Sequence, residues 1–296
     1  MANTLYTAEQ AVEILSVIAS ADLNLAATIS RDVEVGFQPG SGLTVHVRIP
    51  GSTKASTKDP SDTTTAIGLG SIVEQTVPVT LTKNVASRVP LSEADLSLNL
   101  KDFGKQVLRP QAASLVEDVE QAVADVMQDT PLTTLAYDAA NPAKLFTLAR
   151  AELRSRGVNA QTPLLAAVGA GVYGALLDGP ERTFDANGTV RGFTVLESTR
   201  LAADEAIFYV KNAFALALRA PEAPDAPFAA SVKAESENGS FAARLVRAFS
   251  TERGVEESLV NVLRGVRSLP LPVLDPATGA TDLVEHGGAI RVDTSA

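Results

Sequence analysis

Residues 42–90 carry the sequence GLTVHVRIPGSTKASTKDPSDTTTAIGLGSIVEQTVPVTLTKNVASRVP. Apolar and polar side chains alternate over residues 44–49 and again over residues 72–82, and this period of two predicts the two strands of a hairpin. The run between them is polar. Such a hairpin is only marginally stable by itself in water, and a long loop without its own structure is usually functional or disordered. We therefore expect the apolar face of this arm to pack on another copy of the chain, which indicates assembly.

The residues that we expect at this assembly interface lie on the apolar face of the arm and in its polar run. Pro78 cannot donate a hydrogen bond, so the return strand lies at a sheet edge or contains a bulge. An apolar edge needs a partner to cover it. Lys54 and Lys58 lie in the polar run. They contact a neighbour or take part in a crosslink or, in the preferred and simpler interpretation, keep the loop soluble. The expected interface residues are Val45, Val47, Ile49, Lys54, Lys58, Val77, Val79 and Leu81.

Composition limits the classes of protein that this chain can be. Its 296 residues are 45% hydrophobic and 20% charged, which is ordinary for a globular protein with a substantial core. The net charge is −10, and no basic stripe marks a sequence-reading DNA-binding surface. Cysteine is absent, which excludes disulfides, thiolate metal sites and cysteine nucleophiles. No apolar run reaches the roughly 18 residues of a membrane span, so no membrane contact is predicted.

The strongest helix prediction covers residues 112–127, where apolar side chains recur every three or four positions. Glu117, Asp118 and Glu120 are assigned to the solvated face of this helix. Consecutive carboxylates on a helix point in different directions, which argues against an acid–base or metal cluster. The residues predicted to line the buried face are Leu115, Val119, Val123 and Val126.

The rest of the chain reads as a mixture of helices and strands, which places it in the α+β class. Helices are predicted over residues 7–21, 142–156 and 171–177, and Gly157 ends the second. Residues 25–35 are expected to be extended, and the tail after residue 276 is expected to be loosely held. The predicted strands cover residues 163–168, 194–196, 206–210, 229–234, 242–250 and 258–267.

The segment Gly169–Gly174 fits the pattern G-x-G-x-x-G, follows an apolar strand and opens a helix. Glu197, at the end of a later strand, occupies a position suited to a ribose-binding acid. The helix after the glycines is short, however, and no continuing series of strand–helix units surrounds it. A dinucleotide-binding enzyme is therefore the alternative from another functional class, and a junction of small residues is the preferred interpretation.

Two other patterns are weaker. His46 and His286 are the two histidines of the chain and lack the spacing of a metal site, so neither a metal nor a catalytic triad is expected. The Asp185–Gly188 segment begins like a calcium loop but lacks the later ligands, and a hairpin turn explains it better. The sequence predicts no catalytic residue, metal or cofactor.

Several short stretches, taken in order, resemble a known family. They are VPVTLTK (residues 77–83), VPLS (89–92), VLRPQA (107–112), GFTV (192–195) and NAFA (212–215). Their order resembles that of the major capsid proteins of tailed bacteriophages, with the HK97-like fold, and most closely the coat-protein branch typified by short-tailed phages. The resemblance spans about residues 10 to 275, and no single motif is specific.

The resemblance implies a division of the chain into parts. Residues 1–38 are the N-terminal arm and residues 39–91 the extended loop. The peripheral domain comprises residues 92–136 and 253–275, with a spine helix over residues 110–128. The axial domain covers residues 137–252, and residues 276–296 form a C-terminal tail.

The same resemblance implies a function in assembly. The subunit would form hexamers and pentamers of an icosahedral shell around double-stranded DNA, assembled in the host cytoplasm, and mature by domain rotation and movement of the extended loop. Expected partners are other copies of the chain, a scaffolding protein, a portal and possible decoration proteins, with DNA contacted non-specifically. Neither an inserted domain nor a scaffold-like N-terminal segment is expected, which favours a separate scaffold. The alternative within this fold is an encapsulin-type compartment shell.

Overall fold

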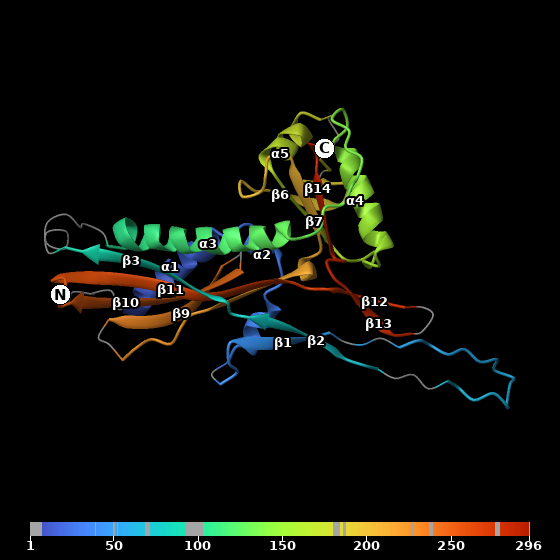
Figure 1. The fold of residues 1–296 in the computed structure, drawn as a ribbon, viewed down its shortest axis with the longest axis horizontal. Coiled ribbons are helices and arrows are strands. Elements are labelled where there is room, and N and C mark those ends of the chain that lie inside the picture. The colour runs from blue at the N-terminus through green and yellow to red at the C-terminus, as the bar shows by residue number, and fades with distance from the viewer. Residues whose placement is uncertain are drawn as a thin grey trace.

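The computed structural model has three visible parts: a long sheet with a helix along it, a compact unit at one end, and a hairpin that projects beneath (Figure 1). α3 (Arg109–Gln128) is the long helix, preceded by the π-helical turn η3 (Gly104–Leu108). It begins with Pro110 in its first turn, where the missing N–H costs little. The structure describes residues 8–38, 40–49, 51, 53–68, 72–92, 103–179, 184–185, 188–225, 228–236, 239–275 and 279–295.

The long sheet is antiparallel and has the strand order β3-β11-β10-β9, and β8 also pairs with β11. α1 (Ala8–Ala21) packs on β9, β10 and α3 through the buried side chains of Val12, Leu15 and Ala19. The first 38 residues therefore pack on their own chain from Ala8 onward. The strands are β3 (Lys83–Leu91), β8 (Phe214–Arg219), β9 (Ala229–Ser236), β10 (Gly239–Ser250) and β11 (Val255–Ser268).

This sheet changes the division of the chain that the sequence suggested. Residues 229–252 were expected in the axial domain, but β9 and β10 pair with each other and with β11, beside the spine helix. Residues 83–91 were expected in the extended loop, but β3 pairs with β11 along its whole length. Strand pairing between distant segments has no local sequence signal. For this reason the domain boundaries in the structure differ from those that the sequence suggested.

The compact unit, which we call the axial unit, holds the sheet β14-β7-β4-β6-β5 with α4 (Ala143–Ser155) and α5 (Ala170–Leu177) beside it (Figure 1). β4 and β6 are parallel, and the other pairs are antiparallel. Phe146, Phe193 and Phe208 meet edge to face in its core. The strands are β4 (Leu164–Val168), β5 (Thr189–Val190), β6 (Phe193–Glu197), β7 (Glu205–Tyr209) and β14 (Ala289–Asp293).

The C-terminal residues are firmly held, so the expectation of a loose tail is wrong. β14 pairs with β7, and Ala289, Ile290 and Val292 are buried. Before it, β12 (Leu271–Leu274) and β13 (Thr281–Val284) form a separate two-stranded sheet. The glycines around residue 288 had suggested a loosely held tail. Ile290 and Val292, two positions apart, instead show the alternating apolar pattern of an edge strand.

Residues 25–35 also differ from the extended conformation that we expected. They form α2 (Leu25–Thr28) and the 3-10 helix η1 (Asp32–Gly36). α2 is held by a contact with the spine helix, described below, that the local sequence does not encode. The predictions on Thr7, Ser52, residues 69–71, 93–102, Asn187 and 276–278 lie outside the described residues.

Candidate assembly surface

The base of the predicted arm is a real hairpin, formed by β1 (Thr44–Ile49) and β2 (Gln75–Thr80). The register pairs Val45 with Val79 and Val47 with Val77, so the apolar residues share one face. Pro78 faces His46 across the pair, in a two-stranded sheet where both strands have a free edge. The first strand ends at Ile49 and the second begins at Gln75, and the described residues between them, 51, 53–68 and 72–74, lie beyond the ladder.

The apolar face of this base is covered by the chain itself, so the expectation that it packs on another copy is wrong. Ile49, Val77, Val79 and Leu81 are buried, and Val45 and Val47 are half-buried against the same group. This second, smaller core lies apart from the main one and places the base against β8 and η1. Its remaining buried members are Val33, Phe37, Ala215, Ala217 and Leu269.

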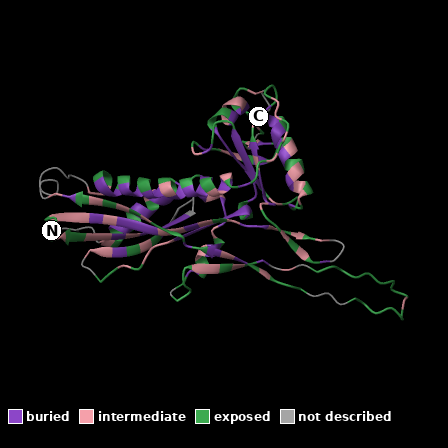
Figure 2. Ribbon diagram, viewed as in Figure 1, coloured by how far each residue is buried: buried purple, intermediate pink, exposed green. Residues whose placement is uncertain are grey.

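The tip of the arm, which we define as residues 53–68, is different. Its side chains are exposed except the half-buried Asp62, and its described residues contain no helix or strand (Figure 2). Lys54 and Lys58 lie here on the exposed surface, and their contact with a neighbour stays a prediction. Ile67 is 70% exposed, and Ile72 and Val73 beside the tip are 65% and 66% exposed. Exposed aliphatic side chains on a projection are suited to contact with another molecule.

Local hydrogen bonds shape the tip. The Asp59 carboxylate accepts hydrogen bonds from the Ser61 hydroxyl and backbone N–H, and these hydrogen bonds lower the pKa of Asp59. Asp62 likewise accepts from Thr64 and Thr65, which lowers the pKa of its carboxyl well below the usual range. These turns order short stretches of the tip without attaching it to the core.

The junction between base and tip rests on the β12–β13 hairpin. The Gln75 side-chain amide donates to the Thr281 carbonyl at 2.7 Å. The two arms of the loop approach closely, since a Cβ on Gly51 would lie 2.3 Å from the Val73 carbonyl oxygen. A Cβ on Gly279 would lie 2.6 Å from the Cβ of Lys54 and 3.0 Å from its backbone nitrogen. The direction in which the tip leaves the molecule is therefore set at this junction.

The spine helix buries the face that the sequence predicts. Leu115, Val119 and Val123 are fully buried, and Val126 is half-buried against the main core. Glu117 and Asp118 lie on the outer side, paired with Arg200 and Arg264 respectively. These four apolar residues therefore have a structural role within the chain.

Glu120 is a residue that the sequence interpretation missed, since we expected it in solvent. Its side chain is 1% exposed, and its carboxylate accepts backbone N–H groups from Asn24, Leu25 and Ala26 at 2.8–3.0 Å. It therefore caps α2 from outside the segment. The signal was available: Glu120 stands four residues after Val116 and three before Val123, within the apolar stripe.

Glu205, on β7, is a second buried carboxylate that we did not single out. It accepts hydrogen bonds from the Gln128 amide at 2.7 Å and from Arg291 at 2.5 Å. Nearby, the Tyr209 hydroxyl lies 2.5 Å from the Thr28 hydroxyl, and burial raises the pKa of this tyrosine. These contacts connect the axial unit to the spine helix and to the N-terminal segment.

The glycine-rich segment does not offer a phosphate site. The end of α5 that would face a dinucleotide is covered by the loop before β7, because Val172 N–H donates to the Ala203 carbonyl. A Cβ on Gly169 would lie 1.9 Å from the Ala202 carbonyl oxygen, so glycine is needed for close packing of two backbone segments. The interpretation as a junction of small residues therefore explains the motif.

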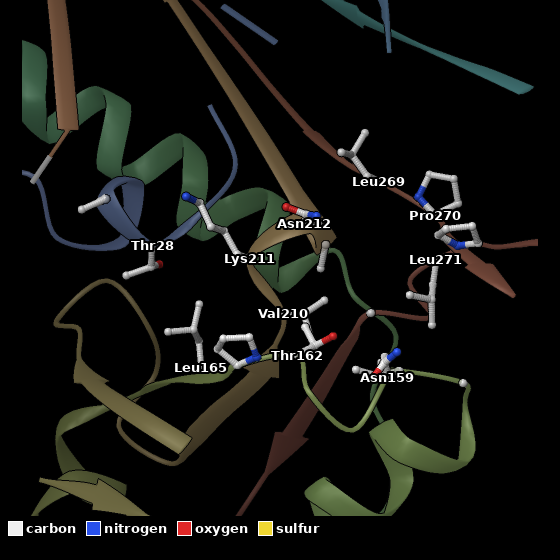
Figure 3. Close-up of a pocket in the computed structure, with 17 residues that line it drawn as sticks. Thr28, Asn159, Thr162, Leu165, Val210, Lys211, Asn212, Leu269, Pro270 and Leu271 are labelled. Carbon is white, nitrogen blue, oxygen red and sulfur yellow. The ribbon is translucent and has the colours of Figure 1, made fainter. Parts of the chain in front are cut away.

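The two histidines lie far from one another along the chain. His46 lies in β1 and His286 in the turn between β13 and β14. No three metal-ligating side chains cluster among the residues that the structure describes. None of the described helices is long and apolar enough to cross a membrane. A pocket of about 700 Å³ lies between the axial unit and the end of the long sheet, with Thr28, Val210, Lys211 and Leu269 around it (Figure 3).

Comparison with known proteins identifies the fold. No family model and no curated protein matches the chain. The capsid of Ralstonia phage GP4 matches with a TM-score of 0.60 and 11% identity, over 99% of this chain and 95% of that chain. A structure of Mycobacterium phage Che8 matches with a TM-score of 0.59 and 14% identity, over 93% and 92%. A virus-like particle from Pyrococcus furiosus matches with a TM-score of 0.52 and 9% identity, over 96% of this chain and 98% of that chain.

At identities of 9–14%, these matches establish architecture. The chain has the HK97-like fold of tailed-phage capsid proteins, with a spine helix, an axial unit and a projecting hairpin, as the resemblance implied. The narrower assignment to the branch of short-tailed phages stays a prediction.

Proposed function

We propose that this protein is the major capsid protein of a tailed bacteriophage. Its copies assemble into hexamers and pentamers of an icosahedral shell that encloses double-stranded DNA. The observation that carries the proposal is the match to a phage capsid over 99% of this chain and 95% of that chain.

Two features of the described residues support a role in assembly. The tip exposes aliphatic and polar side chains on a long projection, which suits a heterologous contact with a neighbouring copy. The net charge of −10 suits a container from which DNA must be able to slide, since an acidic protein attracts polyanions weakly. Scaffolding protein, portal and decoration proteins remain expected partners, and assembly in the host cytoplasm remains an expectation.

A compartment shell that encloses protein cargo is the second candidate. A virus-like particle from Pyrococcus furiosus, matched over 98% of its chain, shares the fold, so the fold by itself does not decide between the two candidates. The two candidates differ in contents: a phage shell fills with DNA, whereas a compartment shell encloses protein.

Electron microscopy of the purified protein, alone and co-expressed with its neighbouring genes, tests the proposal. Closed polyhedral particles that protect DNA from nuclease are expected. Closed particles that hold a folded protein and no DNA would favour the second candidate. A small oligomer that persists under all assembly conditions would contradict both.

A further inference from the structure

The axial unit and the long sheet are joined by three chain crossings. Residues 129–142 lead from α3 to α4, and the 3-10 helix η4 (Lys211–Ala213) leads from β7 to β8. The third crossing runs from β11 through the β12–β13 hairpin to β14. Crossings of this kind hold two bodies together but leave the angle between them to non-covalent contacts.

One such contact is a strap, which we define as residues 24–30. Glu120 on the spine helix holds the three N–H groups at its start. The Asn24 side chain donates to the Glu197 carbonyl of the axial unit at 3.1 Å, and Thr28 meets Tyr209 on β7. The far end enters the long sheet, because Leu216 N–H of β8 donates to the Ser30 carbonyl at 2.9 Å. The strap therefore contacts both bodies, with a buried carboxylate as its anchor.

The second contact between the two bodies involves Glu205, which belongs to the axial unit and binds the spine helix. This axial-unit carboxylate is 4% exposed and accepts from Gln128 in the last turn of the spine helix. Arg291 of β14 also binds Glu205, and its guanidinium donates to the Gln128 carbonyl at 2.6 Å. Within the axial unit Glu205 also accepts from the Ala202 N–H at 3.2 Å, so the bonds that depend on the angle between the two bodies are those from Gln128 to Glu205 and from Arg291 to the Gln128 carbonyl. Because these groups are largely shielded from water, losing both bonds is unfavourable, and they therefore favour one arrangement of the two bodies.

The pocket shown in Figure 3 lies in the same junction. Its walls include the strap residues Ala27 and Thr28, the β7–β8 crossing at Val210–Ala213, and the chain after β11 at Leu269–Pro272. With about 700 Å³ of open space, this side of the junction lacks the close packing of a protein interior. On this side, the axial unit is therefore not held by close packing against the long sheet.

We propose that Glu120 and Glu205 form a two-point lock on the angle between the axial unit and the long sheet. Breaking either point lets the axial unit turn into the pocket. The lock is a property of the single chain, so it stands or falls independently of the proposed shell.

The proposal can be tested with spin labels attached to two introduced cysteines. Because the chain has no cysteine of its own, only these two positions are labelled. Ala113→Cys on the spine helix and Leu177→Cys on α5 are both exposed. The labelled full-length chain is mixed into a large excess of unlabelled chain, and the distance distribution is measured by double electron–electron resonance. One narrow distance is expected for the otherwise unchanged chain.

Glu120→Ala and Glu205→Ala should each broaden or shift this distribution, with a smaller change for Glu120→Gln and Glu205→Gln. Asp118→Asn is the matched control, because it breaks an ion pair of the same helix to Arg264 within the long-sheet body, and it should leave the distance unchanged. Circular dichroism verifies folding, and the glutamine variants are scored if an alanine variant is unfolded.

Hydrogen exchange supplies the second readout. Amide protection at Asn24, Leu25 and Ala26 should fall in the Glu120 variants. Lost protection together with an unchanged distance distribution would overturn the proposal, because the strap would then be released without freeing the angle. A distribution as broad in the Asp118→Asn control would overturn it equally.

Discussion

The base and the tip belong to one continuous arm, yet they relate to the rest of the molecule in opposite ways. The base has regular strands, a fixed register and an apolar face buried in a small core of its own chain. The tip has exposed side chains and short Asp-centred turns. The alternating apolar residues that first indicated assembly therefore lie in the base, whose apolar face is already buried within the subunit. The part left for a neighbour is the polar run with Ile67 and the adjacent Ile72 and Val73.

A charge in the base should have the largest effect. Val79→Asp places an unpaired carboxylate at a fully buried position, and we expect a loss of at least about 3 kcal/mol in the free energy of unfolding. Ile67→Asp in the tip should change it by less than about 0.5 kcal/mol, because Ile67 is exposed. Denaturant unfolding of the two variants measures the difference. Similar losses at both positions would show that base and tip are not distinct.

A methyl group at the boundary should have an intermediate effect. Gly51→Ala brings a Cβ within 2.3 Å of the Val73 backbone carbonyl, which cannot move cheaply, and should cost roughly 1–3 kcal/mol. Gly68→Ala is the matched change in the tip, where the nearest atom is the Ser56 side chain at 3.6 Å. Thermal unfolding should show no loss for this second variant, and a larger loss for Gly68→Ala than for Gly51→Ala would contradict the assignment of the boundary.

Acid should disrupt the Asp62 turn in the tip only at unusually low pH. Of the three changes, this one should affect the rest of the molecule least. The hydrogen bonds that Asp62 accepts from Thr65 and Thr64 lower its pKa, so the ionised carboxylate maintains the turn above the ordinary Asp value of about 3.9. The turn is lost only as the pH falls through the lowered pKa. NMR titration of the Asp62 carboxyl measures this pKa. Titration at the ordinary value would show that the turn does not form in solution.

The sequence predicted those elements whose signal is local. The spacing of Leu115, Val119 and Val123 predicted the spine helix and its buried face, and the alternation at Val45–Ile49 predicted the first strand of the hairpin. Each signal depends only on the period of a helix or strand. The same local pattern says that a face is buried but does not say which partner buries it. This is why the partner of the hairpin base was misjudged.

The missed features depend on contacts between distant segments. Glu120 acts on backbone groups 94–96 positions earlier in the chain, and Glu205 reaches Gln128 from 77 positions later. The membership of β9 and β10 in the long sheet likewise depends on pairing. A charged residue within an apolar stripe, as at Glu120, is the one local sign that a buried polar contact needs a partner elsewhere.

Replacement of residues 53–70 by an Asn-Gly turn tests the central claim most directly, because it removes the tip and leaves the β1–β2 ladder in place. Two quantities are measured on this variant: the free energy of unfolding, and the formation of closed particles by electron microscopy. We predict an unfolding free energy within about 1 kcal/mol of the unchanged chain and no closed particles. Normal particles, or a loss of subunit stability that parallels the loss of assembly, would contradict the claim that the tip belongs to the neighbour and the base to its own chain.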